Sequence, residues 1–247
     1  MGEEFLTLSS KITQEGSATL RAGEARIMCG RYTLATPVDN LVEHFKIDEY
    51  PSSITSSYNI APTQEVAAVI AEEEKRKLEM LRWGLVPAWA DDPSIGNRMI
   101  NARAETVAEK PSFRKAFKDR RCLVLSDGFY EWQRTSDGKQ PYYIHMKDGS
   151  PFAFAGLWES WRDGEEIRSC TIITTDANEL VGEIHKRMPV ILPPEDYDMW
   201  LDPDFEEKEA LSSLLRPYPN DVMEAYPVSR RVNSPSNNAP DCIEPAV

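Results

Sequence analysis

The sequence predicts an α+β fold in a single domain, with antiparallel β-sheets forming a barrel-like or sandwich-like core and helices at the periphery. Three observations predict it. Short runs rich in β-branched and aromatic residues recur at hairpin spacing between residues 121 and 175. Turn-forming sequences at 147–150 and 162–165 separate some of these runs and suggest tight hairpins. Amphipathic helical patterns occur among the strands without the strict alternation of a parallel α/β sheet.

In the first half of the chain, the N-terminal residues 1–27 are polar and lack a core-forming pattern, so we interpret them as a disordered extension or a mis-assigned start. The domain then covers 28–247. Thr36-Pro37 has the signature of a helix start, followed by an apolar face through Phe45. A loop is expected at 52–62, strands at 66–71 and 75–86, and an ordered loop at 91–104 that covers a site.

In the second half, a short helix is expected from Ser112 to Lys118, and strands follow at 121–125, 129–133, 142–146, 152–161 and 167–175. A helix over 178–186 leads to His185, and a strand follows at 188–192. Helices at 194–201 and 206–215 and a last strand at 222–228 complete the chain.

The composition excludes several classes of protein. The 4 cysteines are scattered without a C-x-x-C pair, which argues against a zinc site and a disulfide framework, and no metal or other cofactor is expected. No stretch is long and apolar enough to span a membrane, and residues 1–27 lack a secretory signal. We therefore expect a cytoplasmic monomer without a membrane partner, associated with the nucleoid, or nuclear in a cell that has a nucleus.

The net charge of −13 is unevenly distributed along the chain. Residues 193–247 hold 12 acids and 4 bases, whereas residues 82–121 hold 9 bases and 5 acids. Because contacts with phosphate depend on the local field, a basic face on an acidic protein is compatible with a nucleic-acid partner. The alternative is that these bases form an ordinary solvated surface.

The dipeptide Met28-Cys29 offers an unusual chemistry. Removal of the methionine would leave Cys29 with a free α-amine beside its thiol. These groups titrate near about 8 and about 8.5, so both are reactive near neutral pH. Together they condense with an aldehyde to an imine, which the sulfur closes to a thiazolidine ring. The alternative is a small buried cysteine within a strand.

Two further residues are candidates for proton transfer. Glu131 lies between Tyr130 and Trp132 on a predicted strand, so its side chain points to the opposite face from theirs. If that face is enclosed, desolvation raises the pKa of the carboxyl towards neutrality. His185 is one of 3 histidines and follows a predicted helix. The alternatives are an exposed carboxylate and a packed or surface histidine.

Other polar and aromatic residues suit a nucleic-acid site. Asn101 can anchor a ligand hydroxyl or cap a turn. The arginines at 31, 103 and 187 suit phosphate binding, with a carboxylate partner as the alternative. Trp83 and Trp89, with Pro87 between them, form either core or a wedge on which bases stack.

Seven motifs occur in order between about residues 28 and 245: M-C-G-R-Y, Y-N-I-A-P, W-G-L-V-P-x-W, N-A-R-A-E-T, D-G-F-Y-E-W, A-G-L-W and H-x-R-M-P. This series resembles the SOS-response-associated peptidase (SRAP) family, the abasic-site processing proteins. The resemblance implies an antiparallel β core with a basic cleft for single-stranded DNA. It also implies that the cysteine after the initiator methionine links covalently to the ring-opened sugar of an abasic site.

The resemblance assigns roles residue by residue. Cys29 would be the nucleophile, and Asn101 would position the sugar. Glu131 would move protons, and His185 would assist ring opening and reversal of the crosslink. The residues implied in DNA binding, directly or by shaping the cleft, are Arg31, Asn59, Pro62, Arg82, Trp83, Arg103 and Arg187.

The chain departs from the family at its N-terminus, where residues 1–27 precede Met28. While the nitrogen of Cys29 remains in a peptide bond, neither imine nor thiazolidine can form. Three explanations of the extension stay open: translation begins at Met28, the extension is removed by proteolysis, or this copy is inactive. Two other functions also stay open: a thiol, autoproteolytic peptidase using Cys29 and His185, and a non-catalytic module that binds single-stranded DNA through its arginines and Trp83.

Overall fold

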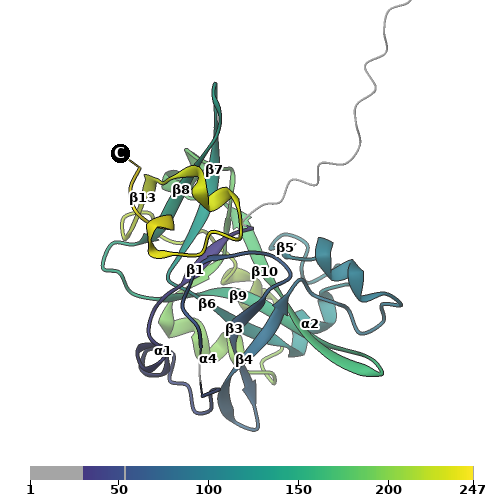
Figure 1. The fold of residues 1–247 in the computed structure, drawn as a ribbon. Helices are drawn as coiled ribbons and strands as arrows, with labels where there is room; N and C mark the ends of the chain where they lie inside the picture. The colour runs from purple at the N-terminus through teal and green to yellow at the C-terminus, as the bar shows by residue number, and fades with distance from the viewer. Residues whose placement is uncertain (1–29, 53, 247) are drawn as a thin grey trace, which may run out of the picture.

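A closed five-stranded barrel forms the centre of the computed structural model, which describes residues 30–52 and 54–246 (Figure 1). Each strand pairs with the next, and the last pairs with the first, through β3–β4, β4–β10, β10–β9, β9–β6 and β6–β3. The pairings are antiparallel except β10 with β4. The strands are β3 (Glu65–Glu72), β4 (Lys75–Trp83), β6 (Arg121–Ser126), β9 (Phe152–Asp163) and β10 (Glu165–Asp176).

A second, five-stranded sheet is antiparallel throughout and has the order β13-β8-β7-β1-β2. Its strands are β1 (Tyr32–Leu34), β2 (Ser57–Ile60), β7 (Gly128–Thr135), β8 (Gly138–Met146) and β13 (Met223–Pro227). The α+β prediction with an antiparallel core is therefore confirmed, with parallel pairings only where β10 meets β4 and β5 among the described strands.

Short elements surround the two sheets. The short strands are β5 (Asn101–Arg103), β11 (Arg187–Pro189) and β12 (Ile191–Leu192), all bonded to β9 or β10. The helices are α1 (Val38–Phe45), α2 (Arg114–Asp119), α3 (Glu179–Gly182), α4 (Tyr197–Leu201) and α5 (Lys208–Ser213). Short 3-10 turns are η1 (Pro93–Arg98), η2 (Pro194–Asp196), η3 (Arg230–Asn233) and η4 (Pro240–Cys242). No helix in these described ranges is long and apolar enough to cross a membrane.

Aromatic contacts join the second sheet to the barrel. The ring of Tyr32 on β1 packs edge-on against Trp83 of β4 at 5.2 Å and against Phe154 of β9 at 5.6 Å between centroids. Such pairs contribute about 0.5–1.5 kcal/mol beyond the burial of their area. The first strand of the chain is thereby fixed in the core, and with it the start of the described residues.

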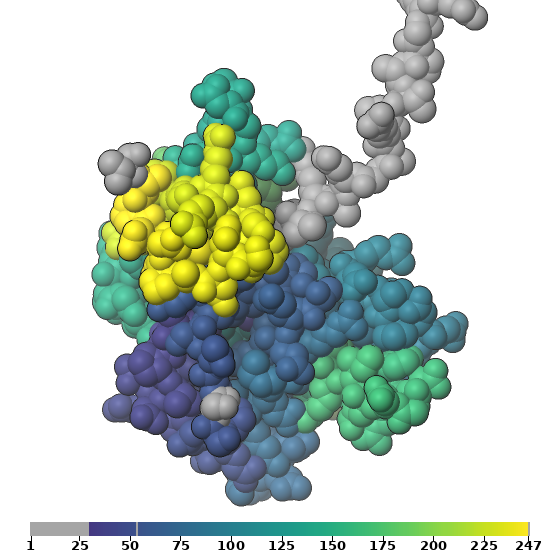
Figure 2. Space-filling view, viewed as in Figure 1, coloured from purple at the N-terminus to yellow at the C-terminus, as the bar shows by residue number. Residues whose placement is uncertain are grey.

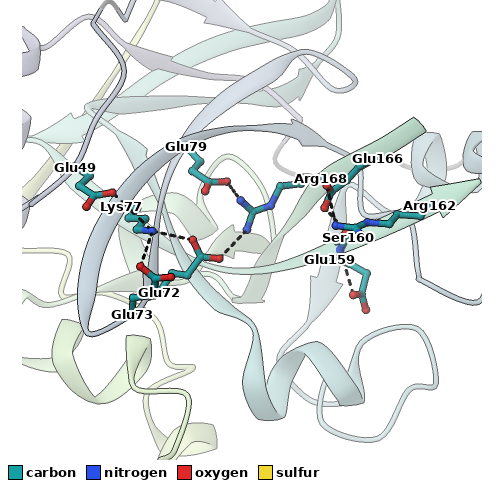
Figure 3. Close-up of polar contacts among 10 residues, drawn as sticks. All are labelled: Glu49, Glu72, Glu73, Lys77, Glu79, Glu159, Ser160, Arg162, Glu166 and Arg168. Carbon is teal, nitrogen blue, oxygen red and sulfur yellow. Dashed lines mark hydrogen bonds and ion pairs between the residues drawn. The ribbon is translucent and has the colours of Figure 1, made fainter. Parts of the chain in front are cut away.

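The outer face of β3, β4 and β10 carries a network of ion pairs (Figure 3). Lys77 lies 3.1 Å from Glu72, 3.7 Å from Glu49 and 3.8 Å from Glu73, and Arg168 pairs with Glu79. Exposed pairs of this kind each stabilise a fold by about 0–1 kcal/mol. Because carboxylates outnumber cations in this network, this face repels a polyanion such as DNA.

Several local predictions are wrong in informative ways. The turn at 147–150 is not a hairpin, because β8 belongs to one sheet and β9 to the other. Ser57–Ile60 is a strand within the expected loop at 52–62, and Asn101–Arg103 is a strand within the expected loop at 91–104. The helix expected over 178–186 spans only Glu179–Gly182, so His185 lies in the connection after it.

Candidate functional site

Strand β7 places Glu131 in an enclosed position. The carboxylate is buried, with 4% of the residue exposed, whereas its neighbours Tyr130 and Trp132 share the other face with ring centroids 6.5 Å apart. The predicted alternation of side chains along this strand is therefore confirmed. The carboxyl group is thereby shielded from bulk solvent on the enclosed face of the strand.

His185 faces Glu131 from a different part of the chain. Its Nδ1 lies 3.9 Å from Oε2 of Glu131, 3.1 Å from the carbonyl oxygen of Arg187 and 3.2 Å from the backbone nitrogen of Arg187. Nδ1 donates to the carbonyl when protonated and accepts from the amide when not, so both protonation states have a partner. The side-chain amide of Gln133 also donates to the carbonyl of Glu183 at 2.9 Å, which ties β7 to this connection.

Strand β10 brings Asn101 and Arg187 to the same region. β5 pairs with β10 so that Asn101 lies opposite Ile172, and β11 pairs with β10 so that Arg187 lies opposite Asp176. Asn101 is half-buried. Strand β10 therefore pairs with two short strands, each of which contains a candidate site residue, although these residues are far apart in the sequence.

Arg187 is engaged with carboxylates rather than exposed to solvent. Only 8% of it is exposed, and its guanidinium pairs with Glu105, with Asp176 at 2.9 Å and with the carbonyl of Thr174 at 2.6 Å. Burial tends to lower the pKa of Arg187, but the hydrogen bonds with Glu105 and Asp176 raise it overall. Arg187 thus has the carboxylate partners of the alternative interpretation, and its expected contact with phosphate stays a prediction.

Arg31 is half-buried beside Trp132. Its Nη1 donates to Oδ1 of Asn59 at 2.7 Å and to the carbonyl of Val232 at 2.6 Å, and its guanidinium carbon lies 5.9 Å from the centre of the Trp132 ring. Burial lowers the pKa of this guanidinium. An arginine keeps its charge under such conditions, so the site contains a fixed cation.

Asn59 is almost completely buried, and its expected part in shaping the cleft stays a prediction. Only 1% of it is exposed, and its amide donates to backbone carbonyls of residues 232, 234 and 237. Its oxygen accepts the hydrogen bond from Arg31. Both ends of the side chain are therefore engaged within the protein.

Trp83 lies in the core, one of the two alternatives that the sequence left open for it. The side chain is completely buried, and its indole nitrogen donates to the carbonyl of Ile100 at 2.9 Å. The exposed indole of this region is Trp89, which is 59% exposed. Neighbouring Arg82 donates to the side chain of Asn97 at 2.8 Å, and Pro62 is half-buried.

The basic segment 82–121 divides into buried, paired and exposed cations. Arg121 is buried and donates to backbone carbonyls that include Trp200 at 2.7 Å, and Arg120 pairs with Glu159 at 2.9 Å. Neither is available to DNA. Arg103 and the bases at 98, 110, 114 and 115 are exposed and, within the described residues, form no ion pair. The number of bases in the segment therefore overstates its unpaired charge at the surface.

Cys29 lies outside the described residues, and the chain is described from its neighbour Gly30 onward. Gly30 is buried, and the next residue, Arg31, accepts a hydrogen bond from the backbone nitrogen of Tyr130 at 2.9 Å. Tyr130 immediately precedes Glu131.

Sequence reasoning missed the roles of Trp132 and Asp127. Asp127 accepts hydrogen bonds from the backbone nitrogens of Ala35 at 2.6 Å and Thr36 at 2.8 Å, which anchors the chain directly after β1. The Asp-Gly pair that starts β7 was a signal for a turn but not for this contact.

No group of three or more residues able to hold a metal ion is present in the described part of the chain.

Comparisons with known proteins identify the family of the chain. The family model described as SOS response associated peptidase (SRAP) matches residues 28–235. The chain is 49% identical over 222 residues to "Abasic site processing protein YoqW" of Bacillus subtilis, covering 88% of this chain and 99% of that protein. It is 34% identical over 220 residues to "Abasic site processing protein HMCES" of Xenopus tropicalis, covering 76% of this chain and 65% of that protein.

A solved structure supports the fold. The crystal structure of a protein from Bacteroides thetaiotaomicron superposes with a TM-score of 0.81 at 30% sequence identity, covering 89% of this chain and 100% of that one. The family match spans more than half of the chain and includes every candidate site residue. The chain belongs to the SOS response associated peptidase (SRAP) family.

Proposed function

We propose that this protein processes abasic sites in single-stranded DNA by forming a covalent thiazolidine crosslink through Cys29. The observation that carries the proposal is the pair of Glu131 and His185, 3.9 Å apart, beside the strand that leads back to Cys29. The names of the relatives support the choice of an abasic site as substrate.

The chemistry begins once removal of Met28 has exposed the α-amine of Cys29. The amine attacks the aldehyde carbon of the ring-opened sugar, and the carbinolamine loses one water to give an imine. The sulfur then adds to the imine carbon, and the thiol proton is transferred to the nitrogen. One aminothiol and one aldehyde thus give one thiazolidine and one water, without any oxidant or reductant.

The described residues supply the proton transfers that these steps require. Ring opening needs a proton at the ring oxygen, and loss of water needs one at the carbinolamine hydroxyl. In the proposed mechanism Glu131 is the proton carrier at the imine, and His185 assists ring opening and reversal of the crosslink. Asn101 positions the sugar through its amide.

The basic face provides the path for the strand. Arg31 and Arg103 are the cations that we place closest to the reacting sugar, with Arg82 at the margin. The carboxylate-rich face of β3, β4 and β10 excludes the strand from that side. Binding to such a local basic face weakens steeply with salt, because each neutralised phosphate releases counterions.

A second candidate function is a thiol peptidase that uses Cys29 as nucleophile and His185 as base, and that removes its own N-terminal residues. The description of the matching family as a peptidase favours it. A thiolate peptidase does not need the α-amine, so the two functions differ in their response to a blocked N-terminus.

The deciding experiment mixes purified protein that begins at Cys29 with an abasic single-stranded oligonucleotide and measures intact mass. We expect the sum of the two masses less one water, and no such product with Cys29→Ala. Cys122→Ala is the matched control and is expected to crosslink normally, since Cys122 is completely buried in β6. Acetylation of the α-amine is expected to abolish the adduct. An adduct that survives acetylation excludes the thiazolidine.

A further inference from the structure

The segment 229–237, here called the C-terminal strap, covers one side of the second sheet. In Figure 2 the C-terminal residues, in yellow, form a compact layer over this side of the molecule. Within the strap, Val232 is completely buried and packs in a small apolar cluster with Tyr130 and Tyr143. The strap is thus held by burial as well as by hydrogen bonds.

Asn59 on β2 is the point to which the strap is tied. Its amide nitrogen donates to the carbonyls of Val232 at 3.2 Å, Ser234 at 3.0 Å and Asn237 at 2.6 Å. Two amide hydrogens serve three carbonyls, so the strap wraps closely around a single side chain. The oxygen of the same amide accepts from Nη1 of Arg31 at 2.7 Å.

The strap fixes Arg31 on two sides. Nη1 of Arg31 also donates to the carbonyl of Val232 at 2.6 Å. The Trp132 ring lies 5.9 Å from the guanidinium carbon, and the Trp132 indole donates to Oδ1 of Asn233 in the strap at 2.8 Å. The strap therefore determines both the position of the guanidinium and that of the ring beside it.

These contacts use only one nitrogen of the guanidinium. Within residues 30–52 and 54–246, Nη1 is the nitrogen of Arg31 with hydrogen-bond partners, and Nε is buried without one. A guanidinium binds phosphate through charge-assisted N–H donors. Nη2 of Arg31 is neither buried nor hydrogen-bonded within these residues, so it is the donor left for an anion.

We propose that Asn59 and the C-terminal strap form a cradle that orients Arg31 towards a phosphate of the bound DNA. Asn59 is then a positioning residue and not a DNA ligand. The inference rests on the proposed function, because it assumes that a DNA phosphate is the anion. It assigns residues from both ends of the domain to one site: Arg31 near the start and the strap near the end.

The test compares Asn59, which holds the strap beside Arg31, with Asn238, which lies just after the strap and bonds β2. Asn59→Ala removes the cradle, whereas Asn238→Ala removes only an anchor that accepts from the Tyr58 nitrogen at 2.6 Å and from Ser57 at 3.2 Å, away from Arg31. The measurements are the melting temperature, the salt dependence of DNA affinity and the single-turnover rate of crosslinking. Arg31→Ala serves as the reference for complete loss of the contact.

For Asn59→Ala, we expect the slope of log affinity against log salt concentration to become shallower by about 0.7, which is the value of one phosphate contact with single-stranded DNA. The same change is expected for Arg31→Ala. The crosslinking rate of Asn59→Ala is expected to fall at least about tenfold. Asn238→Ala is expected to keep slope and rate, whatever its melting temperature. In Arg31→Ala protein, the further change Asn59→Ala is expected to add no loss of slope, since the two act as one unit.

An unchanged slope in folded Asn59→Ala, or an equal loss in Asn238→Ala, overturns the proposal and leaves Asn59 a purely structural anchor. If Asn59→Ala does not fold, Asn59→Ser, which keeps a small polar group, is measured with the same two outcomes. Failure of the unsubstituted protein to crosslink abasic DNA would instead refute the proposed function. The two failures are thereby distinguished.

Discussion

Oε2 of Glu131 and Nδ1 of His185 lie 3.9 Å apart, the carboxylate buried and the imidazole partly exposed. This distance is longer than a hydrogen bond but within the range of an ion pair. The arrangement places a side chain that solvent hardly reaches beside one that solvent partly reaches. Two groups with such different surroundings are suited to different proton transfers of one reaction.

Glu131→Gln is expected to slow crosslink formation by about 10²–10⁴, because the amide cannot carry the proton. The measurement is the single-turnover rate with abasic single-stranded DNA. The matched control is Glu159→Gln, which replaces another buried carboxylate, bonded to Arg120 at 2.9 Å in the barrel. Equal loss of rate in both variants would show that burial of a carboxylate, rather than its place at the site, matters.

His185→Ala is expected to slow ring opening and reversal of the crosslink while leaving the affinity for DNA within about twofold. Rates are followed on a denaturing gel, and affinity is measured with an oligonucleotide that has no abasic site. His145→Ala is the control, since His145 is also half-buried but faces Glu224 at 3.2 Å on β13. A normal rate of reversal in His185→Ala would remove this histidine from the mechanism.

Much of the fold could be predicted because it depends on local patterns. The strands that become β3, β6, β9 and β10 are long apolar or alternating runs, and such runs form strands in almost any context. The facing of Glu131 away from Tyr130 follows from the period of two along a strand. The pairing of sheets could not be predicted, since it depends on contacts between residues distant in the sequence.

The contacts that could not be predicted belong to residues whose partners are distant in the sequence. Asn59 is a polar residue of a type that often binds ligands. Its three carbonyl partners, however, come from the far end of the chain. Arg121 contributes to a basic segment in the sequence, yet both faces of β6 are buried and its charge is surrounded by carbonyls. Charge counted along a sequence therefore overstates the charge that reaches a surface.

Arg31→Glu is expected to weaken binding to single-stranded DNA by at least about tenfold and to reduce its salt dependence, because it removes one phosphate contact. The control is Arg162→Glu, which changes the net charge equally at the tip of the β9–β10 hairpin, where Arg162 pairs with Glu166 at 3.0 Å. Affinities are measured at several salt concentrations. Equal effects of the two variants would mean that overall charge, not a site, governs binding.

Glu105→Gln is expected to lower the melting temperature near neutral pH. The hydrogen bond from Arg187 lowers the pKa of the Glu105 carboxyl. A carboxyl with a lowered pKa in the folded state stabilises the protein above its unfolded pKa, and this stability disappears as pH falls through the folded pKa. The difference from the unsubstituted protein should therefore be present at pH 7 and vanish well below about pH 4.

The size of this effect is expected to be about 0.5–1 kcal/mol, because the Glu105 side chain is half-exposed and solvent screens the pair. Thermal melts between pH 7 and pH 3 provide the measurement. Glu43→Gln, which alters an exposed carboxylate on α1 without an ion pair in the described structure, is the control. A difference for Glu105→Gln that persists at low pH would contradict the assignment of this pair.

The last prediction concerns the N-terminus and follows from the chemistry of an amide. While Cys29 is acylated by Met28, its nitrogen has no lone pair free to attack an aldehyde. A chain that starts at Met28 exposes the amine after removal of one methionine, whereas a chain that starts at Met1 does so only after cleavage. We therefore expect the first to crosslink abasic DNA and the second to do so only when processed.

The test prepares both chains, verifies each N-terminus by intact mass and compares their adducts on a denaturing gel. Cys29→Ala in the shorter chain is the negative control, since it keeps the α-amine but lacks the sulfur that closes the ring. An imine without ring closure is expected to reverse on heating, so this variant should give no heat-stable product. Equal crosslinking by a verified, uncleaved chain from Met1 would exclude the α-amine, because a secondary amide nitrogen cannot form an imine under any protonation state of Glu131 or His185.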